Sequence, residues 1–257
     1  MDTLLQNLRY AARRLRRAPG FTFIVVLTLG LGIGANAAIF SVVNTVLLRP
    51  FPYREPGRLI TIDHFYPGLN NLEAGASAPG YRDLRDRGRI FDGVTVETGW
   101  APALTGQCEA RQLTGARVSG QFFATLGVVP MIGRALREDE DAPGSHRAVV
   151  LSHGLWQRDF GGERGVLGRT IQLDNEPFEI VGVMPPSFHD FFNRRVEIFA
   201  PLALAPELFS DDRRTNEYLS LIARLKPGIG EAQARREMTA FADRLKTDYP
   251  NSYAPDW

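Results

Sequence analysis

FTFIVVLTLGLGIGANAAIFSVVNTVLL, at residues 21–48, is the stretch that decides the architecture of this chain. It contains no charged residue, and Asn36 and Asn44 are its only strongly polar members. About 20 apolar residues, each rising ~1.5 Å in a helix, cross the hydrocarbon core of a bilayer. The run is long enough to cross with some tilt, and we therefore predict one transmembrane helix over residues 21–48.

A cleavable secretory signal is the alternative interpretation of the same residues. Ala35-Asn36-Ala37 forms an A-x-A pattern after an apolar run, and arginines precede that run, as they do in signal peptides. Cleavage there would leave an apolar amino terminus that needs burial of its own, and the region before it is long for a signal. N-terminal sequencing of the purified protein distinguishes the two interpretations.

Small residues recur every four positions inside the predicted helix, at Gly30, Gly34 and Ala38. Small side chains spaced in this way allow the backbone of a second helix to approach closely. These three residues are therefore a predicted helix-packing seam. Glycine and alanine are frequent in membrane helices generally, and that simpler explanation stays open.

Charge is concentrated before the helix. The first twenty residues contain one acidic residue and five arginines, which are Arg9, Arg13, Arg14, Arg16 and Arg17, while the whole chain has a net charge of only +1. Arginines flank the cytoplasmic end of membrane helices. The sequence thus predicts a cytoplasmic amino terminus and an extracytoplasmic location for residues 49–257.

Residues 1–20 have the pattern of a cytoplasmic amphipathic basic segment. Leu4, Leu8, Ala11 and Leu15 fall on one helical face, and Pro19-Gly20 is predicted to break this helix before the span. Such a segment lies on membrane lipid, where its arginines face anionic head groups or a cytoplasmic partner. A basic flank that only sets the orientation of the span is the alternative.

The remaining residues predict an α+β fold, because short strands and helices alternate without a regular βαβ repeat. Alternating or apolar runs predict strands at residues 59–62, 94–97, 116–118, 148–151, 171–173, 178–184, 196–199 and 217–225. Ser77, Ser119 and Ser152 are predicted helix N-caps, with helix ends near Gly88, Gly127 and Gly161. A final amphipathic helix carries Ala234, Met238, Phe241 and Leu245 on one face, and Asn175-Glu176-Pro177 is a predicted turn.

No motif in the chain indicates catalysis, a cofactor or a metal. The four histidines lack zinc-protease spacing, there is no Walker A pattern and no Gly-x-Ser-x-Gly, and Cys108 is the only cysteine. The acidic run 138–141 lacks the alternation of a calcium loop, so we expect a solvated turn or helix start there. No basic patch with interleaved aromatic residues indicates nucleic acid. We therefore expect no enzyme.

Several segments resemble one family when taken together and in order. They are LRYAARRLRRAPGFT, LTLGLGIGANAAIFSVVNTVLLRPFPY, ARVSGQFFATLGVVPMIGRAL, VVLSHGLWQRDFGG, GVLGRTIQLDNEPFEIVGVMPPSF and ARLKPGIGEAQARREM. They are similar to the amino terminus and periplasmic core domain of MacB/FtsX-type ABC transporter permeases, especially the unfused branch with duplicated permeases. The resemblance covers essentially the whole chain.

The resemblance implies a domain arrangement and a set of partners. The expected parts are the segment 1–20, the span 21–48, a porter-like periplasmic lobe at 49–114 and 191–257, and an inserted smaller lobe at 115–190. The expected partners are a cytoplasmic ABC ATPase subunit, a second copy of the chain or a second permease, membrane lipid, and a periplasmic adaptor or substrate. The expected location is the bacterial inner membrane, with one span in this chain.

In this family, dimerisation of the ATPase moves the periplasmic domains through the membrane helices, which is called mechanotransmission and serves efflux or lipoprotein and peptide handling. Family members continue into three further membrane helices, so we expect this chain to be a fragment, a truncated product or part of a split system. A membrane-tethered binding or sensory domain without transport is the alternative function, and a tethered enzyme is a third.

Overall fold

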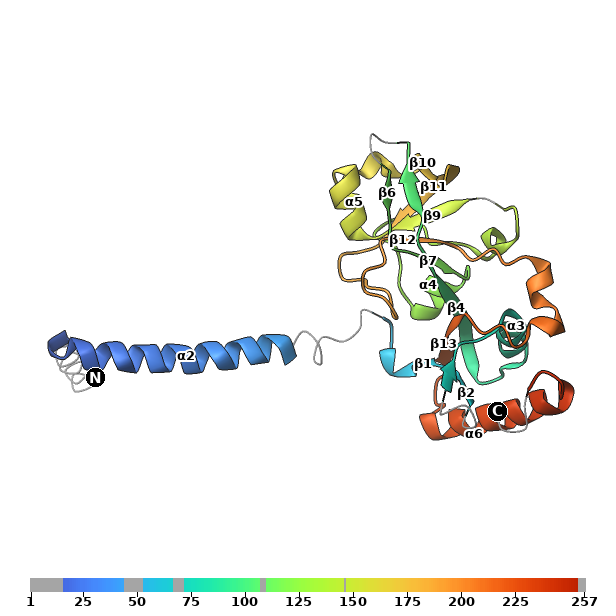
Figure 1. Ribbon diagram of the computed structural model, residues 1–257, viewed down its shortest axis with the longest axis horizontal. Coiled ribbons are helices and arrows are strands. Elements are labelled where there is room, and N and C mark those ends of the chain that lie inside the picture. Colours follow the sequence, from blue (N-terminus) through green and yellow to red (C-terminus); the bar gives the residue numbers. More distant parts are fainter. Residues whose placement is uncertain (1–15, 44–52, 67–71, 107–109, 146, 254–257) are drawn as a thin grey trace. The chain divides into compact units, whose positions relative to one another are not determined.

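The computed structural model describes residues 16–43, 53–66, 72–106, 110–145 and 147–253. The chain divides into two compact units, Met1–Phe51 and Pro52–Trp257. The first contains one long helix, and the second contains the strands and the shorter helices (Figure 1).

The long helix α2 (Pro19–Val43) carries the apolar run. Its 25 residues extend about 37 Å, which exceeds the ~30 Å of a bilayer core. Its two threonines bond backbone carbonyls four residues earlier, since the Thr22 hydroxyl donates to the Ala18 carbonyl at 3.0 Å and the Thr28 hydroxyl to that of Ile24 at 2.8 Å. Hydrocarbon offers no hydrogen-bond partner, so this arrangement suits a membrane. Among the described residues, α2 is the one helix with the length and composition of a span.

The start of α2 differs slightly from the prediction. The chain is helical at residues 16–17, is interrupted at Ala18 and becomes helical again from Pro19. Proline suits the first position of a helix because its missing N–H would be unpaired there anyway. The break therefore falls at Ala18, one residue before the predicted position, and Pro19 and Gly20 are the first residues of the long helix. The predicted end of the span at residue 48 lies outside the described residues.

The second unit contains thirteen described strands and four α-helices. The helices are α3 (Ala78–Arg87), α4 (Phe122–Leu126), α5 (His153–Phe160) and α6 (Glu231–Asp248). The strands are β1 (Leu59–Thr61), β2 (His64–Tyr66), β3 (Leu72–Ala74), β4 (Phe91–Trp100), β5 (Ala103–Thr105), β6 (Arg111–Gln112), β7 (Gly115–Val118), β8 (Ile132–Gly133), β9 (Ala148–Leu151), β10 (Thr170–Leu173), β11 (Glu176–Val183), β12 (Ile198–Pro201) and β13 (Ser220–Leu225). Short 3₁₀ turns are η2 (Pro56–Arg58), η4 (Glu138–Asp141), η5 (Arg164–Val166), η6 (Pro206–Phe209) and η7 (Asp211–Arg213).

One mixed sheet organises this unit, in the order β1-β13-β4-β7-β12-β9-β11-β10-β5-β6, with β8 on β11. The pairs β11–β9 and β12–β7 are parallel and the others are antiparallel, and β2 and β3 form a separate hairpin. This confirms the predicted α+β class. The sheet runs through segments assigned to both predicted lobes, and the division into a porter-like and an inserted lobe stays a prediction.

Side chains alternate between two faces of strand β13, as its sequence predicts. Leu221 and Ala223 pack with α3 and α6 in one apolar cluster. Ile222, on the other face, joins a second cluster that contains Tyr53 and the phenylalanines of α4. A third cluster packs α5 against β9 to β12. Figure 1 shows α6 and α5 at different ends of the unit.

Two predicted helix caps are confirmed and one is wrong. The Ser77 hydroxyl accepts from the Gly80 N–H and begins α3, and the Ser152 hydroxyl accepts from the Leu155 N–H and begins α5. Ser119 instead bonds the Thr95 hydroxyl at 2.5 Å across two buried strands. Gln121 occupies the N-cap of α4 without a side-chain bond.

The strand predicted at residues 94–97 is found within the longer β4, where these four residues are buried on both faces. Two further expectations need correction. The hairpin turn is centred on Asp174 and Asn175, both at positive φ, one residue before the predicted turn. The acidic run forms the 3₁₀ turn η4, in line with the expected turn or helix start, but it is only partly solvated: Glu140 is 1% exposed and pairs with Arg134 at 2.6 Å.

Candidate functional site

The second unit begins with residues 53–58, here called the junction segment because they follow the predicted span. Tyr53 is 5% exposed, and its hydroxyl donates to the His189 carbonyl at 2.8 Å. Its ring stacks on Phe191 with centroids 5.8 Å apart and meets Phe188 edge-on at 6.4 Å. A buried tyrosine combines a large apolar contact with one directed hydrogen bond. Tyr53 thus fastens the start of the unit to the loop after β11.

The next residues fasten the junction segment to α4. The Arg54 N–H donates to the Leu126 carbonyl at 3.2 Å, at the carboxyl end of the helix. Gly127, at φ 68°, ends that helix, and a Cβ on it would lie 2.4 Å from the Arg54 Cβ. Only glycine combines the left-handed backbone with this close approach.

Arg58 fastens the segment to the sheet. Its Nε donates to the Leu225 carbonyl at 2.8 Å, which ties it to β13. Its guanidinium also contacts the carboxylates of Glu55, within the segment, and Asp92, on β4. These carboxylates raise the pKa of Arg58 and keep it charged.

A buried arginine lies beneath the segment. Arg224, on β13, is 6% exposed, and its Nε donates to the Thr125 carbonyl at 2.6 Å while Nη1 reaches the Glu55 carbonyl at 3.4 Å. Burial lowers its pKa. A cation suits the carbonyl-rich carboxyl end of a helix. Arg224 therefore joins the junction segment, α4 and β13 through one side chain.

Two buried carboxyl groups lie behind Tyr53. Glu97, on β4, is 5% exposed and Asp190, after β11, is 3% exposed. One Asp190 oxygen accepts from the backbone N–H groups of Phe192 and Asn193 at 3.2 and 2.8 Å. Glu97 Oε2 and Asp190 Oδ1 accept from no donor among the described residues.

One proton shared between the two carboxyl groups accounts for the missing donor at both oxygens. Burial first, then repulsion and a hydrogen bond with Asp190, raise the pKa of Glu97 to about 9, and burial raises the pKa of Asp190. An ionised carboxylate only accepts hydrogen bonds, whereas a protonated one donates. Glu97 protonated at neutral pH thus links β4 to the loop that holds Tyr53.

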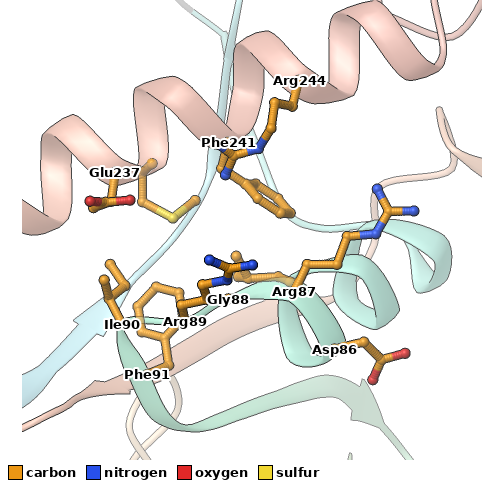
Figure 2. Close-up of a pocket in the computed structure, with 11 residues that line it drawn as sticks. Asp86, Arg87, Gly88, Arg89, Ile90, Phe91, Glu237, Phe241 and Arg244 are labelled. Carbon is orange, nitrogen blue, oxygen red and sulfur yellow. The ribbon is translucent and has the colours of Figure 1, made fainter.

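A groove of about 540 Å³ lies between α3 and α6 on the other face of the sheet (Figure 2). Figure 2 shows Phe241 pointing from α6 toward the turn at Gly88, with Arg87 and Arg89 on the facing side. The lining is Leu84, Asp86, Arg87, Gly88, Arg89, Ile90, Phe91, Glu237, Met238, Phe241 and Arg244. An apolar floor with arginines at the rim suits an amphipathic, partly anionic chain.

A fully buried arginine holds the two helices that border this groove. Arg214 pairs with Asp83 of α3 at 2.7 Å, and its guanidinium lies 3.3 Å from the ring centroid of Tyr249, just beyond α6. Its exposed fraction is 0%. Arg214 therefore links α3 to the chain just beyond α6 beneath the groove.

The predicted seam residues Gly30 and Gly34 lie on α2, and a Cβ at either would meet no atom within 4 Å. The side chain of Ala38 lies outside the described residues. Arg16 and Arg17 are exposed at the start of the described chain, while Arg9, Arg13 and Arg14 precede it. The roles predicted for the seam and for the arginines stay predictions.

The sequence interpretation did not single out the junction residues. Arg224 interrupts the apolar run of β13, and Glu97 follows Val94 and Val96 on β4. A charge within such a strand is a usable signal of a buried polar link. Tyr53 and Asp190 carry no such local signal, because their importance depends on contacts across 136 residues of sequence.

Three solved structures share this fold. The MacB periplasmic region from Actinobacillus actinomycetemcomitans is 17% identical, with a TM-score of 0.52 over 76% of this chain and 92% of that one. The extracellular domain of the noncanonic ABC-type transporter YknZ from Gram-positive bacteria is 16% identical, with a TM-score of 0.53 over 74% and 95%. A domain of a protein described as a permease, from Porphyromonas gingivalis, is 16% identical, with a TM-score of 0.56 over 76% and 84%.

No curated protein matches the chain. At this level of identity the three structures establish the fold alone. The model of a sequence family, described as the MacB-like periplasmic core domain, matches residues 22–241. Because this match spans most of the sequence, the chain belongs to the family of MacB-like periplasmic core domains.

Proposed function

We propose that this chain is the permease subunit of a MacB/FtsX-like ABC transport system that couples dimerisation of a cytoplasmic ATPase to motion of its extracytoplasmic domain. Family membership identifies an ABC-transporter-associated permease, a transporter component that works with a cytoplasmic ATPase. It agrees with a periplasmic domain anchored by α2. The mechanical coupling, the orientation and the inner-membrane location are our proposal.

The observation that carries the coupling proposal is the density of contacts made by the junction segment. Within six residues it bonds the loop after β11, the end of α4, and strands β13 and β4. A force applied to the chain before Tyr53 therefore reaches several elements of the unit at once. A passive tether needs no such arrangement, since a flexible linker suffices to hold a domain at a membrane.

The proposed ATPase contact is tested by replacing Arg9, Arg13, Arg14, Arg16 and Arg17 with glutamine in the tagged full chain. We expect the ATP hydrolysis that co-purifies from native membranes to fall to background. A matched control replaces five exposed arginines of the second unit, which are Arg164, Arg169, Arg213, Arg235 and Arg236. Unchanged hydrolysis in the first variant, or equal loss in both, would contradict the proposal.

Orientation is tested in the same preparation. With Cys108 replaced by serine, Glu176→Cys places a thiol at the exposed start of β11. We expect a membrane-impermeant maleimide to label it in intact spheroplasts. Labelling only after permeabilisation would place the second unit in the cytoplasm and end the permease proposal.

The groove between α3 and α6 favours one other function, a tethered binding or sensory domain. Such a domain would bind its partner through the second unit alone, with residues 1–17 dispensable. The arginine variants separate the two functions, because a sensory domain needs no co-purifying ATPase.

A further inference from the structure

Exposed apolar side chains gather beside the junction segment. Val129 is 77% exposed, Met131 47% and Phe192 43%. Val129 is the most exposed large apolar side chain in the described part of the chain, including those of α2. A packed domain usually exposes such side chains where it meets an apolar or interfacial surface.

Contacts place these side chains next to the start of the unit. Val129 follows Gly127 by two residues, at the helix end that bonds the Arg54 N–H. Phe192 lies next to Phe191, whose ring stacks on Tyr53. The exposed apolar groups therefore belong to the loops that hold the junction segment.

The sheet brings those loops to one edge. The Met131 N–H donates to the Val183 carbonyl, and the Met184 N–H donates to that of Leu151, each at 2.8 Å. Three segments consequently lie next to each other at the same end of these strands: residues 127–131, residues 185–195 and the amino end of α5. We call these three segments the junction face.

The junction face also carries positive charge around a cavity of about 350 Å³. Its cationic and titratable lining residues are His153, Arg158, His189, Arg194 and Arg195. Arg194 and Arg195 are exposed and form no ion pair with any described residue. The two acidic lining residues are engaged, since Glu197 pairs with Arg158 at 2.7 Å and Asp190 accepts backbone N–H groups.

The length of the chain limits how far this face can lie from lipid. Five positions separate Leu48, the end of the apolar run, from Tyr53. Five residues reach at most ~18 Å even when fully extended. Tyr53 therefore lies within this reach of the end of the run, and the ring of Phe191, in the junction face, stacks on Tyr53.

We propose that the junction face rests in the head-group layer of an anionic bilayer. Phe192, Val129 and Met131 enter the interface, and Arg194 and Arg195 bind lipid phosphate. Aromatic side chains favour this layer, and arginine forms bidentate bonds with phosphate. The inference deepens the proposed function, because it requires α2 to be in a membrane. The membrane surface would then fix the resting position of the domain that the ATPase moves.

The test uses the full chain in vesicles, with Cys108 replaced by serine and an environment-sensitive fluorophore on a single new cysteine. Phe192→Cys and Val129→Cys report on the junction face, and Glu176→Cys, at the opposite end of β11, is the control. The vesicles contain phosphatidylethanolamine and phosphatidylglycerol, with a quencher on the lipid head groups. We expect strong quenching at both junction positions and little at the control.

A second measurement isolates the charge. Arg194→Gln with Arg195→Gln should weaken quenching at Val129→Cys in anionic vesicles to the level seen in phosphatidylcholine vesicles. The matched pair Arg235→Gln with Arg236→Gln, on α6 across the sheet, should leave quenching unchanged. Each arginine near an anionic surface contributes about 1 kcal/mol, roughly a fivefold change in partitioning.

The outcomes separate this inference from the proposed function. A chain that does not float with vesicles has no membrane anchor, and both proposals then fail. A chain that floats but shows equal quenching at all three positions overturns the junction-face inference alone. Cross-linking of Phe192→Cys between two copies, without lipid quenching, overturns it as well and assigns the face to a second copy.

Discussion

At the scale of single residues, the buried carboxyl pair is the most unusual feature of the second unit. Glu97 and Asp190 come from segments far apart in sequence, and each has an oxygen that needs a donor. Leaving such a group unsatisfied costs about 1–3 kcal/mol. A proton on Glu97 removes that cost, so the link between β4 and the loop after β11 depends on pH.

The direction of this dependence follows from the pKa of Glu97, which is about 9 in the folded chain. The unfolded chain releases this proton near pH ~4.3, the ordinary value for glutamate. Between these values the folded state holds more protons, so stability falls as pH rises. The stabilisation from the protonated Glu97 is complete below the pKa of the unfolded chain and is lost as the pH rises through the pKa of the folded chain. The raised pKa of Asp190 acts in the same direction.

Glu97→Gln should remove much of this dependence, because an amide donates to Asp190 at every pH. We expect the variant to match the parent near pH ~5 and to exceed its unfolding free energy by roughly 1–3 kcal/mol near pH ~9. Thermal unfolding in detergent across this range provides the measurement. Glu237→Gln, at an exposed position, is the control, and a gap that does not widen with pH would refute a shared proton.

At the scale of elements, the carboxyl end of α4 is the contact point between a helix and the junction segment. Gly127 and Gly161 end α4 and α5 with similar φ angles of 68° and 62°. They differ in surroundings, because a Cβ on Gly127 would collide with the Arg54 Cβ while one on Gly161 would meet nothing within 4 Å. Comparing substitutions at Gly127 and Gly161 therefore distinguishes the cost of backbone strain from the cost of packing against the junction segment.

Gly161→Ala should cost about 1–2 kcal/mol of unfolding free energy, the penalty of a left-handed alanine. Gly127→Ala should cost that amount plus about 1–3 kcal/mol for overpacking against Arg54. Denaturant unfolding of the two variants gives the difference. Adding Arg54→Gly to Gly127→Ala should recover the packing part, and equal costs for the two single variants would argue against a tight junction.

At the scale of the whole molecule, the proposed coupling depends on a direct connection between the span and the junction segment. The chain divides into two compact units, and the covalent chain joins them between Phe51 and Pro52. In the proposed coupling, motion that the ATPase produces reaches the second unit through that chain. The contacts of residues 53–58 with α4, β4 and β13 are the proposed route by which this motion spreads through the unit.

A flexible Gly-Ser insertion between Phe51 and Pro52 should uncouple the units. We expect the wild-type chain, purified with its ATPase, to show an ATP-dependent change in hydrogen exchange at residues 53–58. The insertion should abolish that change while the thermal midpoint of the second unit stays the same. The same insertion between Pro143 and Gly144, an exposed loop, should keep the response. An ATP response that survives the first insertion would contradict mechanical coupling through the chain.

Local pattern was sufficient for much of the second unit. Ser77 and Ser152 begin helices, Gly127 and Gly161 end them, and β13 alternates as its residues indicate. These features depend on hydrogen bonds and side-chain periodicity within a few residues. Ser119 was mispredicted because a serine hydroxyl can form a hydrogen bond either at a helix N-cap or with a neighbouring buried strand, and the local sequence suits both. Tertiary packing decided between them.

The sequence by itself determined the apolar helix, the α+β class and the family, since each depends on composition, periodicity or segment order along the chain. Only the tertiary structure decided that Tyr53 bonds the loop after β11, that Glu97 faces Asp190, and that Arg224 reaches the Glu55 carbonyl, because these contacts join positions separated by dozens of residues. It also decided that Val129 and Phe192 stay exposed on one edge. Burial is a property of the assembled sheet, and no short window of sequence specifies which loops that sheet brings together.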